Sequence, residues 1–479
     1  MTTDDAGSVK FELRGRDLAL MAPAALWELS DDAVFMALFG PDEAGGAAVL
    51  LSRDRRGRCW RARPFDFPRL RDALTAHGAY AVHVAFDEHP LLPVAPELAV
   101  TPRPYQEEAL IAWRAAEYRG VVVLPTGAGK TVLGALAIAD LGLRSLVVVP
   151  TIDLLRQWQA ALLHALGLPA EQVGVYGGGE HAIAPITVIT YESAQLHPEL
   201  LRRFGLLVFD ECHHLPAPTY RQIAEGAFTP YRLGLSATPE RGDQEHLALA
   251  QLIGPEVYRR APEELAAARY LAAYDEHRLG VSLAPEDQAR YEAARETYRA
   301  YLRRHRITIT SPADFQRKVL WAAARDRGAR EAMLAWREAR ALALNAPAKL
   351  ALLEEIFARH AAERVLVFSE FNSVVAAIGE RFALPTITHK TPAEERRAIL
   401  ERFRDGRYTK LASGRVLNEG VDIPDCGVAV IVSGTATRRE YIQRLGRVLR
   451  PKETRAVLYE LVTEGTSEER VSERRREAL

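Results

Sequence analysis

The sequence contains few residues of several informative kinds. Its three cysteines lie far apart in a chain of 479 residues, at positions 59, 212 and 426, and no CxxC pair occurs. This spacing argues against a disulfide framework or a zinc ribbon and indicates reduced thiols. Lysine is also scarce, since only seven of the 62 basic side chains are lysine. We attribute this bias to genome composition and not to a binding role.

Long apolar runs are missing as well. No segment reaches the roughly 18 consecutive apolar residues that a membrane helix requires. The amino-terminal stretch MTTDDAGSVKFELRG is acidic and has no apolar core of the secretory type. The formal net charge is −1, which excludes a uniformly basic nucleic-acid coat but not a local basic channel. We expect a cytoplasmic protein without a membrane partner.

The length and the pattern of apolar runs predict about three domains. Residues 1–98 form a small amino-terminal domain that ends in DEHPLLPVAPELAVTPRP, which we interpret as a linker. In residues 99–262, short apolar runs such as SLVVVP and LLVFD alternate with helical sequence, as in a parallel sheet covered on both faces. The alternation returns in residues 263–479, after a helical insert at about 285–345. The predicted fold class is therefore α/β, with two parallel-sheet units in tandem.

The stretch LPTGAGKT, at 124–131, has the composition of a phosphate-binding loop. It follows the predicted strand VVVL and opens a helix, whose amino terminus favours an anion. Small residues let backbone N–H groups surround a phosphate, a lysine adds charge, and a hydroxyl holds Mg²⁺. Leu124 replaces the first glycine of the strict pattern, but it still belongs to the predicted strand and precedes the residues that would surround the phosphate. The predicted phosphate-binding residues are Thr126, Gly127, Ala128, Gly129, Lys130 and Thr131.

A second signal lies in LLVFDECHH, an apolar strand that ends in two carboxylates. A carboxylate at the carboxyl end of such a strand is where the Mg²⁺ of a nucleotide is held. We assign this role to Asp210, acting directly or through water, and Thr131 would share the metal. Glu211 would act as the general base that polarises the attacking water. Cys212, between these acids and the histidines, is expected to be a packed small residue.

These motifs, in this order, resemble those of superfamily 2 helicases and translocases. PTGAGKT, DECH and SATP (236–239) lie in the first unit, and EGVDIP (419–424) and QRLGRVLR (443–450) resemble motifs V and VI in the second. The resemblance spans about 99 to 465. It implies two RecA-like domains, hydrolysis of ATP with Mg²⁺, and DNA as the partner. It also implies nucleotide contacts from Gly420 and Asp422.

The second unit supplies cations of the kind that stabilise the charge on a γ-phosphate. Arg447 and Arg450 lie three residues apart, so both can project from one face of a helix, and Gln443 shares that face. Arginines that reach a nucleotide from another domain raise hydrolysis rates by about 10³ to 10⁵ in related enzymes. We therefore predict catalytic roles for Arg447 and Arg450, with Gln443 as a nucleotide contact.

The resemblance assigns further residues by motif. RPYQEEAL resembles the adenine-recognising Q motif, with Gln106 on the adenine edge and Arg103 orienting it. Ser236 and Thr238 of SATP, with His213, resemble the group that couples hydrolysis to domain closure. PTIDLLRQW and TYES resemble motifs Ia and Ib, which contact the nucleic-acid backbone. The implied contacts in these two segments are Thr151, Arg156 and Thr190.

Within the superfamily, RLGLSATPERGDQEH and SGTATRREYIQRLGRVLRP resemble the XPB family. That family carries an Arg-Glu-Asp triplet used in opening duplex, and here the positions are Arg241, Gly242 and Asp243. The helical insert resembles the family's thumb. In it, Arg303 and Arg304 lie near Tyr298 and Tyr301 in sequence, and these side chains either grip DNA or form a solvated face over a packed helix. The stretch at 53–69, with seven arginines and three aromatics, either contacts DNA or covers a local core.

The sequence therefore predicts an XPB-like, ATP-dependent DNA helicase or translocase that moves 3′ to 5′ and acts in DNA repair, associated with the nucleoid when bound to DNA. Its partners would be single-stranded or forked DNA, with a separate nuclease as a further possibility from the resemblance. One alternative is a duplex translocase or fork remodeller without strand separation, of the phage UvsW-like or restriction type, which the loss of the acid at Gly242 favours slightly. The other is a non-enzymatic nucleic-acid clamp.

Overall fold

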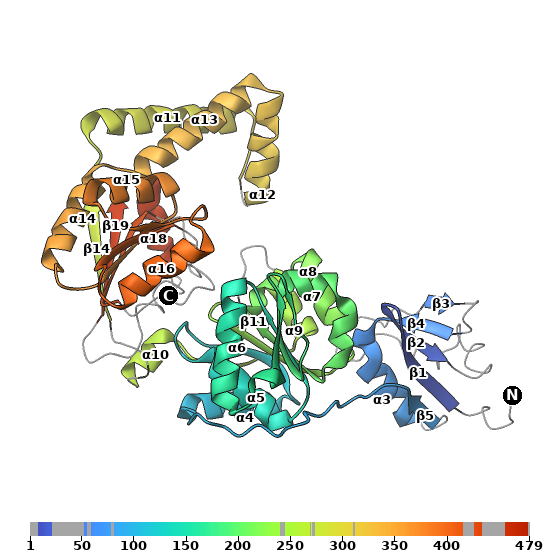
Figure 1. Cartoon of the computed structure of the whole chain (residues 1–479). Coiled ribbons are helices and arrows are strands. Elements are labelled where there is room, and N and C mark those ends of the chain that lie inside the picture. The colour runs from blue at the N-terminus through green and yellow to red at the C-terminus, as the bar shows by residue number, and fades with distance from the viewer. Residues whose placement is uncertain are drawn as a thin grey trace. The chain divides into compact units, whose positions relative to one another are not determined.

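The computed structural model describes residues 8–21, 52–54, 59–77, 81–239, 245–268, 270, 274–309, 312–414, 426–433 and 456–477. The chain divides into two compact units, the first made of Met1–Leu124 and Gly129–Arg260 and the second of Ala261–Leu479 with the short segment Pro125–Ala128 (Figure 1). No helix in these ranges is both long enough and apolar enough to span a bilayer. The three cysteines are all buried and unbonded to one another.

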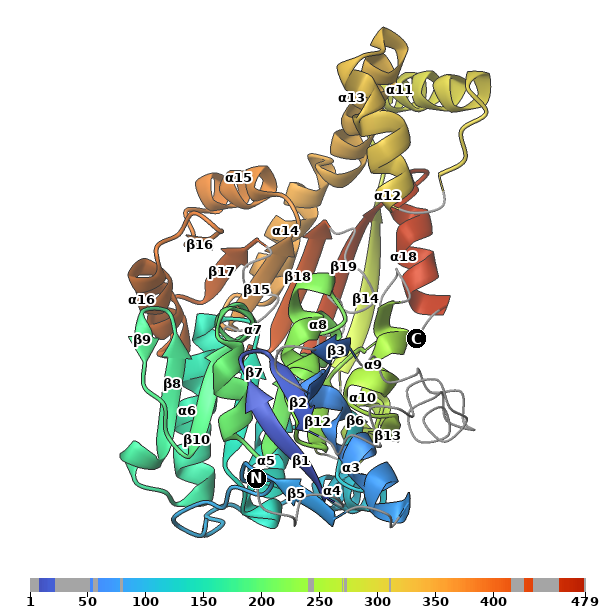
Figure 2. The ribbon, with the colours of Figure 1, turned by 90° about the vertical axis from the view of Figure 1, so that its right-hand side faces the viewer.

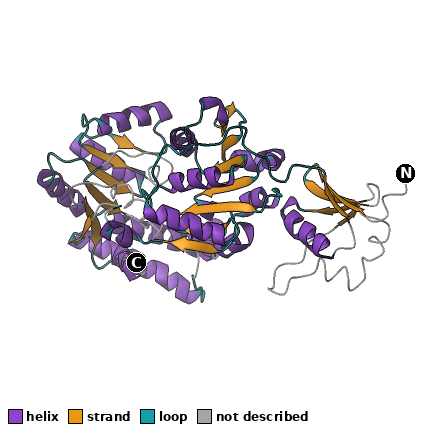
Figure 3. Cartoon of the chain, turned by 90° about the horizontal axis from the view of Figure 1, so that it is seen from below, coloured by secondary structure: helices purple, strands orange, loops and turns teal. Residues whose placement is uncertain are grey.

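The amino-terminal part of the first unit is a small sheet covered by one helix (Figure 3). In the described residues its strand order is β3-β4-β2-β1-β5, in which only β1 and β5 run parallel. Apolar side chains from β1, β2 and β4 pack with the helix in one core, which explains the alternation of apolar and polar residues along β1. The elements are β1 Ser8–Arg14, β2 Asp17–Met21, β3 Ser52–Asp54, β4 Cys59–Ala62, α3 Phe67–His77 and β5 Ala81–Val84.

This small domain shares its core with the larger sheet of the same unit. Phe228, from the loop before β12 (Tyr231–Ser236), packs in the small domain's apolar cluster, with its ring 6.1 Å from that of Phe67 and 4.7 Å from that of Phe86. An ion pair of 3.2 Å between Arg63 and Glu225 crosses the same boundary. The amino-terminal domain is therefore packed against the larger sheet and is not tethered beside it.

Arg232 lies at the centre of this boundary and is fully buried. Its guanidinium donates to the carbonyl oxygens of Thr229, Leu252 and Ala227 and lies 4.6 Å from the centre of the Phe65 ring. Burial lowers the pKa of Arg232 well below its ordinary value. Three carbonyl acceptors and an aromatic face replace the water that the cation loses, so no anion is required at this position.

The segment predicted as a linker is a strap fixed along the surface of the first unit. Backbone hydrogen bonds join Leu92 N–H to the Gly142 carbonyl (2.8 Å) and Arg144 N–H to the Pro90 carbonyl (2.7 Å). Farther along, Ala99 N–H donates to the Ala165 carbonyl at 2.9 Å. The strap therefore connects the two domains, as its prolines suggested, but it is bound to the surface at several points along its length.

The larger sheet of the first unit has, in the described residues, eight strands in the order β13-β6-β12-β11-β7-β10-β8-β9, all parallel except for β9. Its central strands are buried along their whole length because helices cover both faces (Figure 1). The strands are β6 Arg119–Val123, β7 Ser145–Val149, β8 Val173–Gly177, β9 Glu180–His181, β10 Ile186–Thr190, β11 Leu206–Asp210, β12 Tyr231–Ser236 and β13 Glu256–Arg259. The helices are α4 Pro104–Ala115, α5 Lys130–Leu141, α6 Ile152–Leu166, α7 Tyr191–Leu196, α8 Pro218–Glu225 and α9 Leu249–Leu252.

The second unit contains a six-stranded parallel sheet in its described residues, in the order β14-β19-β18-β15-β17-β16 (Figure 2). Its strands are β14 Tyr274–Val281, β15 Val365–Ser369, β16 Thr386–Ile387, β17 Lys410–Ser413, β18 Val428–Ser433 and β19 Ala456–Thr463. Its helices are α10 Pro262–Ala267, α11 Pro285–Arg304, α12 Pro312–Phe315, α13 Arg327–Leu344, α14 Ala348–Arg359, α15 Asn372–Phe382, α16 Ala393–Arg404 and α18 Ser467–Glu477.

The helical insert of this unit is built on the pair α11 and α13, which lie side by side (Figures 1 and 2). Tyr291 is buried between them among alanines of both helices, because small residues allow the two backbones to approach closely. The Tyr301 hydroxyl donates to Asp326, which also caps α13 by accepting from the N–H groups of Gly328 and Ala329. These tyrosines therefore hold the insert together.

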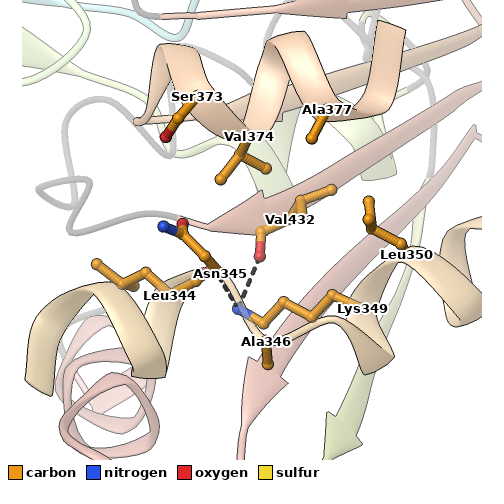
Figure 4. Close-up of a pocket in the computed structure, with 9 residues that line it drawn as sticks. All are labelled: Leu344, Asn345, Ala346, Lys349, Leu350, Ser373, Val374, Ala377 and Val432. Carbon is orange, nitrogen blue, oxygen red and sulfur yellow. Dashed lines mark hydrogen bonds between the residues drawn. The ribbon is translucent and has the colours of Figure 1, made fainter. Parts of the chain in front are cut away.

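A buried ion pair ties α14 to α18. Lys349 Nζ lies 2.7 and 2.8 Å from the two carboxylate oxygens of Glu468, and the two side chains are 1% and 3% exposed. The ammonium also donates to the Val432 carbonyl at 2.8 Å, and Glu468 accepts from Thr463 N–H at 2.9 Å. Lys349 and Val432 border a mainly apolar cavity of about 130 Å³ beside α15 (Figure 4). Every charge in this cluster has a partner, as burial requires.

Candidate active site

The loop between β6 and α5 has the form of an anion cradle. Gly127 and Gly129 have φ values of 85° and 75°, which favour glycine. A Cβ at Gly129 would lie 2.6 Å from Gln106 Nε2, so a side chain here would displace the end of Gln106. At its start the loop is fixed to the neighbouring strand, because Leu124 N–H donates to the Ser236 carbonyl at 3.0 Å. The loop then turns into the amino terminus of α5, whose first residue is Lys130.

Two observations fit this cradle to a nucleoside triphosphate with Mg²⁺. The hydroxyl oxygen of Thr126 is buried, and the residues that the structure describes offer it no hydrogen-bond partner. Among the described residues, Lys130 Nζ has two long contacts, 3.4 Å to the Leu124 carbonyl and 3.5 Å to Glu211 Oε1. Thr131, in the first turn of α5, places a further hydroxyl there. A polyphosphate would satisfy the hydroxyl and the ammonium, and Thr131 with Asp210 offers oxygen ligands to Mg²⁺.

Asp210 ends β11 and is almost fully buried, at 4% exposure. Its Oδ1 accepts from the Glu211 N–H at 3.0 Å and its Oδ2 from the Trp158 indole N–H at 2.7 Å. Desolvation, with the charge of Glu211 beside it, raises the pKa of Asp210 to about 6. A hard cation would reverse this balance by favouring the ionised carboxylate.

Glu211 has a left-handed backbone, with φ of 46° and ψ of 53°. For a residue with a side chain this conformation is uncommon and often occurs at functional sites. Its carboxylate lies 3.5 Å from Lys130 Nζ through Oε1, and Oε2 lies 3.5 Å from both His213 Nδ1 and Ser236 Oγ. The strained turn therefore directs this carboxylate towards the lysine of the cradle.

The predicted coupling residues form one hydrogen-bonded group. Ser236 Oγ lies 3.2 Å from His213 Nδ1 and accepts from the Thr238 N–H at 3.1 Å. The Thr238 hydroxyl is buried and has no partner among the described residues. Cys212 beside them is fully buried, and burial raises the pKa of its thiol well above the ordinary value, so it remains a packed small residue.

Comparisons with known proteins place this site in a family. Residues 99–241 match the model of the type III restriction enzyme res subunit, and residues 348–452 match the helicase conserved C-terminal domain. The chain is 43% identical to the DNA 3'-5' translocase XPB2 of Sulfurisphaera tokodaii over 376 residues, 78% of this chain and 84% of that protein. The chain belongs to the XPB family of superfamily 2 helicases.

More distant relatives agree. The DNA 3'-5' helicase XPB of Mycobacterium tuberculosis is 32% identical over 343 residues, and the matched region spans 70% of this chain but only 55% of that protein. The crystal structure of the Pyrococcus furiosus Hef helicase domain matches with a TM-score of 0.56 at 20% identity, over 78% of this chain and 98% of that chain. This likeness supports the fold, two RecA-like domains in tandem.

The residue predicted to read adenine in this XPB-family chain is engaged within the protein. Gln106 accepts from the Arg103 N–H at 2.9 Å and donates from Nε2 to the Gly129 carbonyl at 3.2 Å. Arg103 in turn donates to the Tyr105 hydroxyl at 3.1 Å. Gln106 therefore links α4 to the phosphate cradle, an arrangement that the motif alone did not indicate.

The predicted nucleic-acid contacts in the first unit lie at helix starts on one edge of the sheet. Thr151 caps α6 by accepting from the Leu154 N–H, and Thr190 caps α7 by accepting from the Ser193 N–H, both at 3.2 Å. β7 and β10, which precede these helices, are neighbouring parallel strands. Arg156 is exposed and forms an ion pair with Glu180. The roles of these residues on a polymer remain predictions.

The remaining predicted contacts of this XPB-family chain lie on the helical insert, in the amino-terminal domain or outside the described residues. Arg303 on the insert is exposed and paired with Glu296, and Arg304 lies beside it in the last turn of α11. In the arginine-rich stretch of the amino-terminal domain, Trp60 and Phe67 are buried in the core. The structure therefore favours the packing alternative for these two aromatics. Seven predicted site residues lie outside the described residues: Arg241, Asp243, Gly420, Asp422, Gln443, Arg447 and Arg450.

Sequence reasoning missed two aromatic contacts to Asp210. Trp158 reaches its carboxylate from α6, and the Tyr191 hydroxyl donates to its backbone carbonyl at 3.1 Å from α7. Both residues lie inside the segments that resemble motifs Ia and Ib, for which the resemblance implies only contacts to the polymer. The signal available was a tryptophan on the apolar face of a predicted helix, and this pattern is also typical of ordinary core packing.

Proposed function

We propose that this protein couples hydrolysis of ATP to 3′ to 5′ movement on DNA, as an XPB-family helicase or translocase. The observation that carries the proposal is the placement of Glu211 3.5 Å from Lys130 at the mouth of a glycine cradle, in a chain of this family. The adjacent Thr126 hydroxyl, buried and unsatisfied within the described residues, supports a phosphate ligand. This combination distinguishes a working hydrolase from a clamp, which does not need a base beside the lysine.

Each residue of the site would have a specific role in hydrolysis. Bound ATP and Mg²⁺ supply the phosphoanhydride bond and the charge that screens it. Lys130 holds phosphate oxygens, while Thr131 and Asp210 hold the metal. The Glu211 carboxylate orients the attacking water and accepts its proton. Arg447 and Arg450 would complete the site from the second unit, with Gly420, Asp422 and Gln443 as nucleotide contacts.

The polymer would follow the helix starts at Thr151 and Thr190, where free N–H groups favour phosphate. Arg156, Arg303 and Arg304 would add contacts to its backbone, in exchange for their present ion-pair partners where they have one. The preferred substrate would be single-stranded or forked DNA, in a cytoplasmic DNA-repair reaction at the nucleoid. A separate nuclease that acts on the exposed strand is part of the same proposal.

The test is steady-state ATP hydrolysis with no polymer, with single-stranded, forked and duplex DNA, and with RNA, beside a Lys130→Ala control. We expect DNA to stimulate turnover and the control to be inactive. Polarity follows from displacement of a labelled oligonucleotide placed at either end of a single strand. Hydrolysis that no polymer stimulates, or binding without hydrolysis, would contradict the proposal, and the second result would identify a clamp.

A duplex translocase that does not separate strands is the second candidate. Two observations favour it: Gly242 stands where the family's triplet has an acid, and the Sulfurisphaera relative is named a translocase. Displacement of a triplex-forming strand, compared with unwinding of a forked duplex, separates the two activities. Triplex displacement without unwinding would select the translocase.

A further inference from the structure

Trp158 has an unusual combination of partners for a buried tryptophan. It is 1% exposed, and its single polar group, the indole N–H, donates to a carboxylate, Asp210 Oδ2, at 2.7 Å. A hydrogen bond to a charged group is stronger than one to a neutral acceptor. The second oxygen of the same carboxylate accepts from the Glu211 N–H. Together the two donors fix the plane of the carboxylate without using its remaining lone pairs.

Helix α5, which follows the phosphate-binding loop, has a glycine at the point where the ring of Trp158 packs against it. Gly134 lies in the interior of α5, where glycine costs about 1 kcal/mol relative to alanine. A Cβ at this position would lie 2.6 Å from Trp158 Cη2 and 2.8 Å from Cζ3. The glycine therefore removes an atom that would collide with a rigid ring. Trp158 contacts the helix of the cradle on one side and the acid at the end of β11 on the other.

Trp158 also belongs to the helix on which a polymer contact is predicted. It lies two turns along α6 from the Thr151 cap, on the buried face of that helix. A displacement of α6 would therefore move the Asp210 carboxylate, because the indole N–H of Trp158 is hydrogen-bonded to it. None of the motif assignments gives the tryptophan a role.

We propose that Trp158 is a positioning residue that holds the Asp210 carboxylate in the orientation required for the metal–nucleotide complex. In the second part of this proposal, binding of the polymer displaces helix α6, and the hydrogen bond from Trp158 transmits that displacement to the carboxylate at the ATP site. The inference rests on the proposed function for its second part. Gly134 serves the same role indirectly, by leaving room for the ring.

The decisive variants are Trp158→Phe and Gly134→Ala. The first removes the N–H donor and keeps an aromatic ring. The second keeps the indole N–H donor but displaces the ring that carries it, although alanine is the better helix residue. Trp113→Phe is the matched control, because Trp113 is equally buried and its indole N–H donates at 2.9 Å to a backbone carbonyl, that of Arg232. Circular dichroism and thermal unfolding establish that each variant folds.

The first readout is binding and not turnover. Affinity for a fluorescent ATP analogue is measured in Mg²⁺ and in EDTA, in the full-length protein. We expect Trp158→Phe to reduce the Mg²⁺-dependent gain in affinity by about ten-fold, in line with the loss of a hydrogen bond to a charged group, and to leave the affinity in EDTA unchanged. Gly134→Ala should show the same selective loss, and Trp113→Phe should not. The two site changes should be non-additive, because phenylalanine leaves space for the alanine Cβ.

The second readout is the factor by which single-stranded DNA changes the affinity for the Mg²⁺-bound analogue, which is the coupling between the two ligands. We expect this factor to be smaller in Trp158→Phe than in the wild type. If wild-type protein shows no such factor, the proposed function fails, while the first readout still decides the role of Trp158. Equal losses in Mg²⁺ and EDTA, a change below two-fold, or the same loss in Trp113→Phe would overturn the inference.

Discussion

The buried pair of Lys349 and Glu468 allows a quantitative prediction for the second unit. We consider Lys349→Met, which keeps the length of the side chain and removes its charge. In the wild type, burial raises the pKa of Glu468, and the ammonium of Lys349 opposes this rise. Without the lysine, the carboxylate is left 3% exposed, with Thr463 as its remaining hydrogen-bond partner in the described residues. We expect it to take up a proton in the folded variant.

The cost of that proton sets the size of the effect. At pH 7, protonating a carboxyl group whose unfolded pKa is about 4.3 requires about 3.7 kcal/mol. This value agrees with the roughly 3–5 kcal/mol lost when one partner of a buried ion pair is removed. Because the folded pKa lies above the unfolded one, the loss grows with pH until pH passes the folded pKa. On acidification the stability of the variant should therefore recover by about 1.4 kcal/mol per pH unit, leaving a cost of about 1 kcal/mol at pH 5. The wild type should recover less, because Lys349 limits the rise in the pKa of Glu468.

The assay is unfolding by urea, followed through hydrogen exchange of amides in β18 and β19, because a chain of several domains does not give one global transition. The control is the double variant Lys349→Met with Glu468→Gln. It keeps an acceptor for the Thr463 N–H but has no carboxyl group to titrate, so its own stability should lack this pH dependence. A loss in the single variant that is the same at pH 5 and pH 8 would refute the reasoning, since it would mean that the carboxylate stays ionised.

Three further predictions concern the first unit. Glu211→Gln should lower the turnover number by about 10² to 10⁴ while leaving nucleotide binding intact, measured by single-turnover hydrolysis and equilibrium titration; unchanged turnover would remove Glu211 from the role of base. Gly129→Ala should weaken nucleotide binding by at least ten-fold, because its φ is positive and the new Cβ meets Gln106; binding at the wild-type level would show that the loop tolerates a side chain. Phe228→Ala should destabilise the packing of the amino-terminal domain by about 3–5 kcal/mol, seen as faster proteolysis within residues 59–77; protection equal to that of the wild type would show that the strap alone holds the domain.

The fold class could be predicted from the sequence because parallel strands buried on both faces give continuous apolar runs. LLVFD and VAVIV became the central strands β11 and β18, and the fold class is confirmed. The phosphate cradle could be predicted for a similar reason, since the chemistry depends on residues adjacent in sequence. The domain boundaries, by contrast, remain predictions.

Contacts between distant residues could not be predicted in the same way. Trp158 and Asp210 are 52 positions apart, and a motif that names one carries no information about the other. The bond from Gln106 to the Gly129 carbonyl depends on how α4 packs beside the cradle, which no local pattern determines. Similarly, prolines in the segment after β5 predicted a linker, but only the structure shows which backbone groups that segment bonds to.

That strap has a mechanical consequence. A flexible tether of eighteen residues would let its two ends separate by about 25 Å and fluctuate freely. Here the backbone bonds at Pro90, Leu92 and Ala99 leave almost no slack between the domains they join. Whatever binds the amino-terminal domain is therefore held at a set distance from the phosphate cradle. The position of the amino-terminal domain is fixed by the surface against which it packs. Residues inserted into the strap at an exposed turn would therefore not let the domain move farther from the larger sheet.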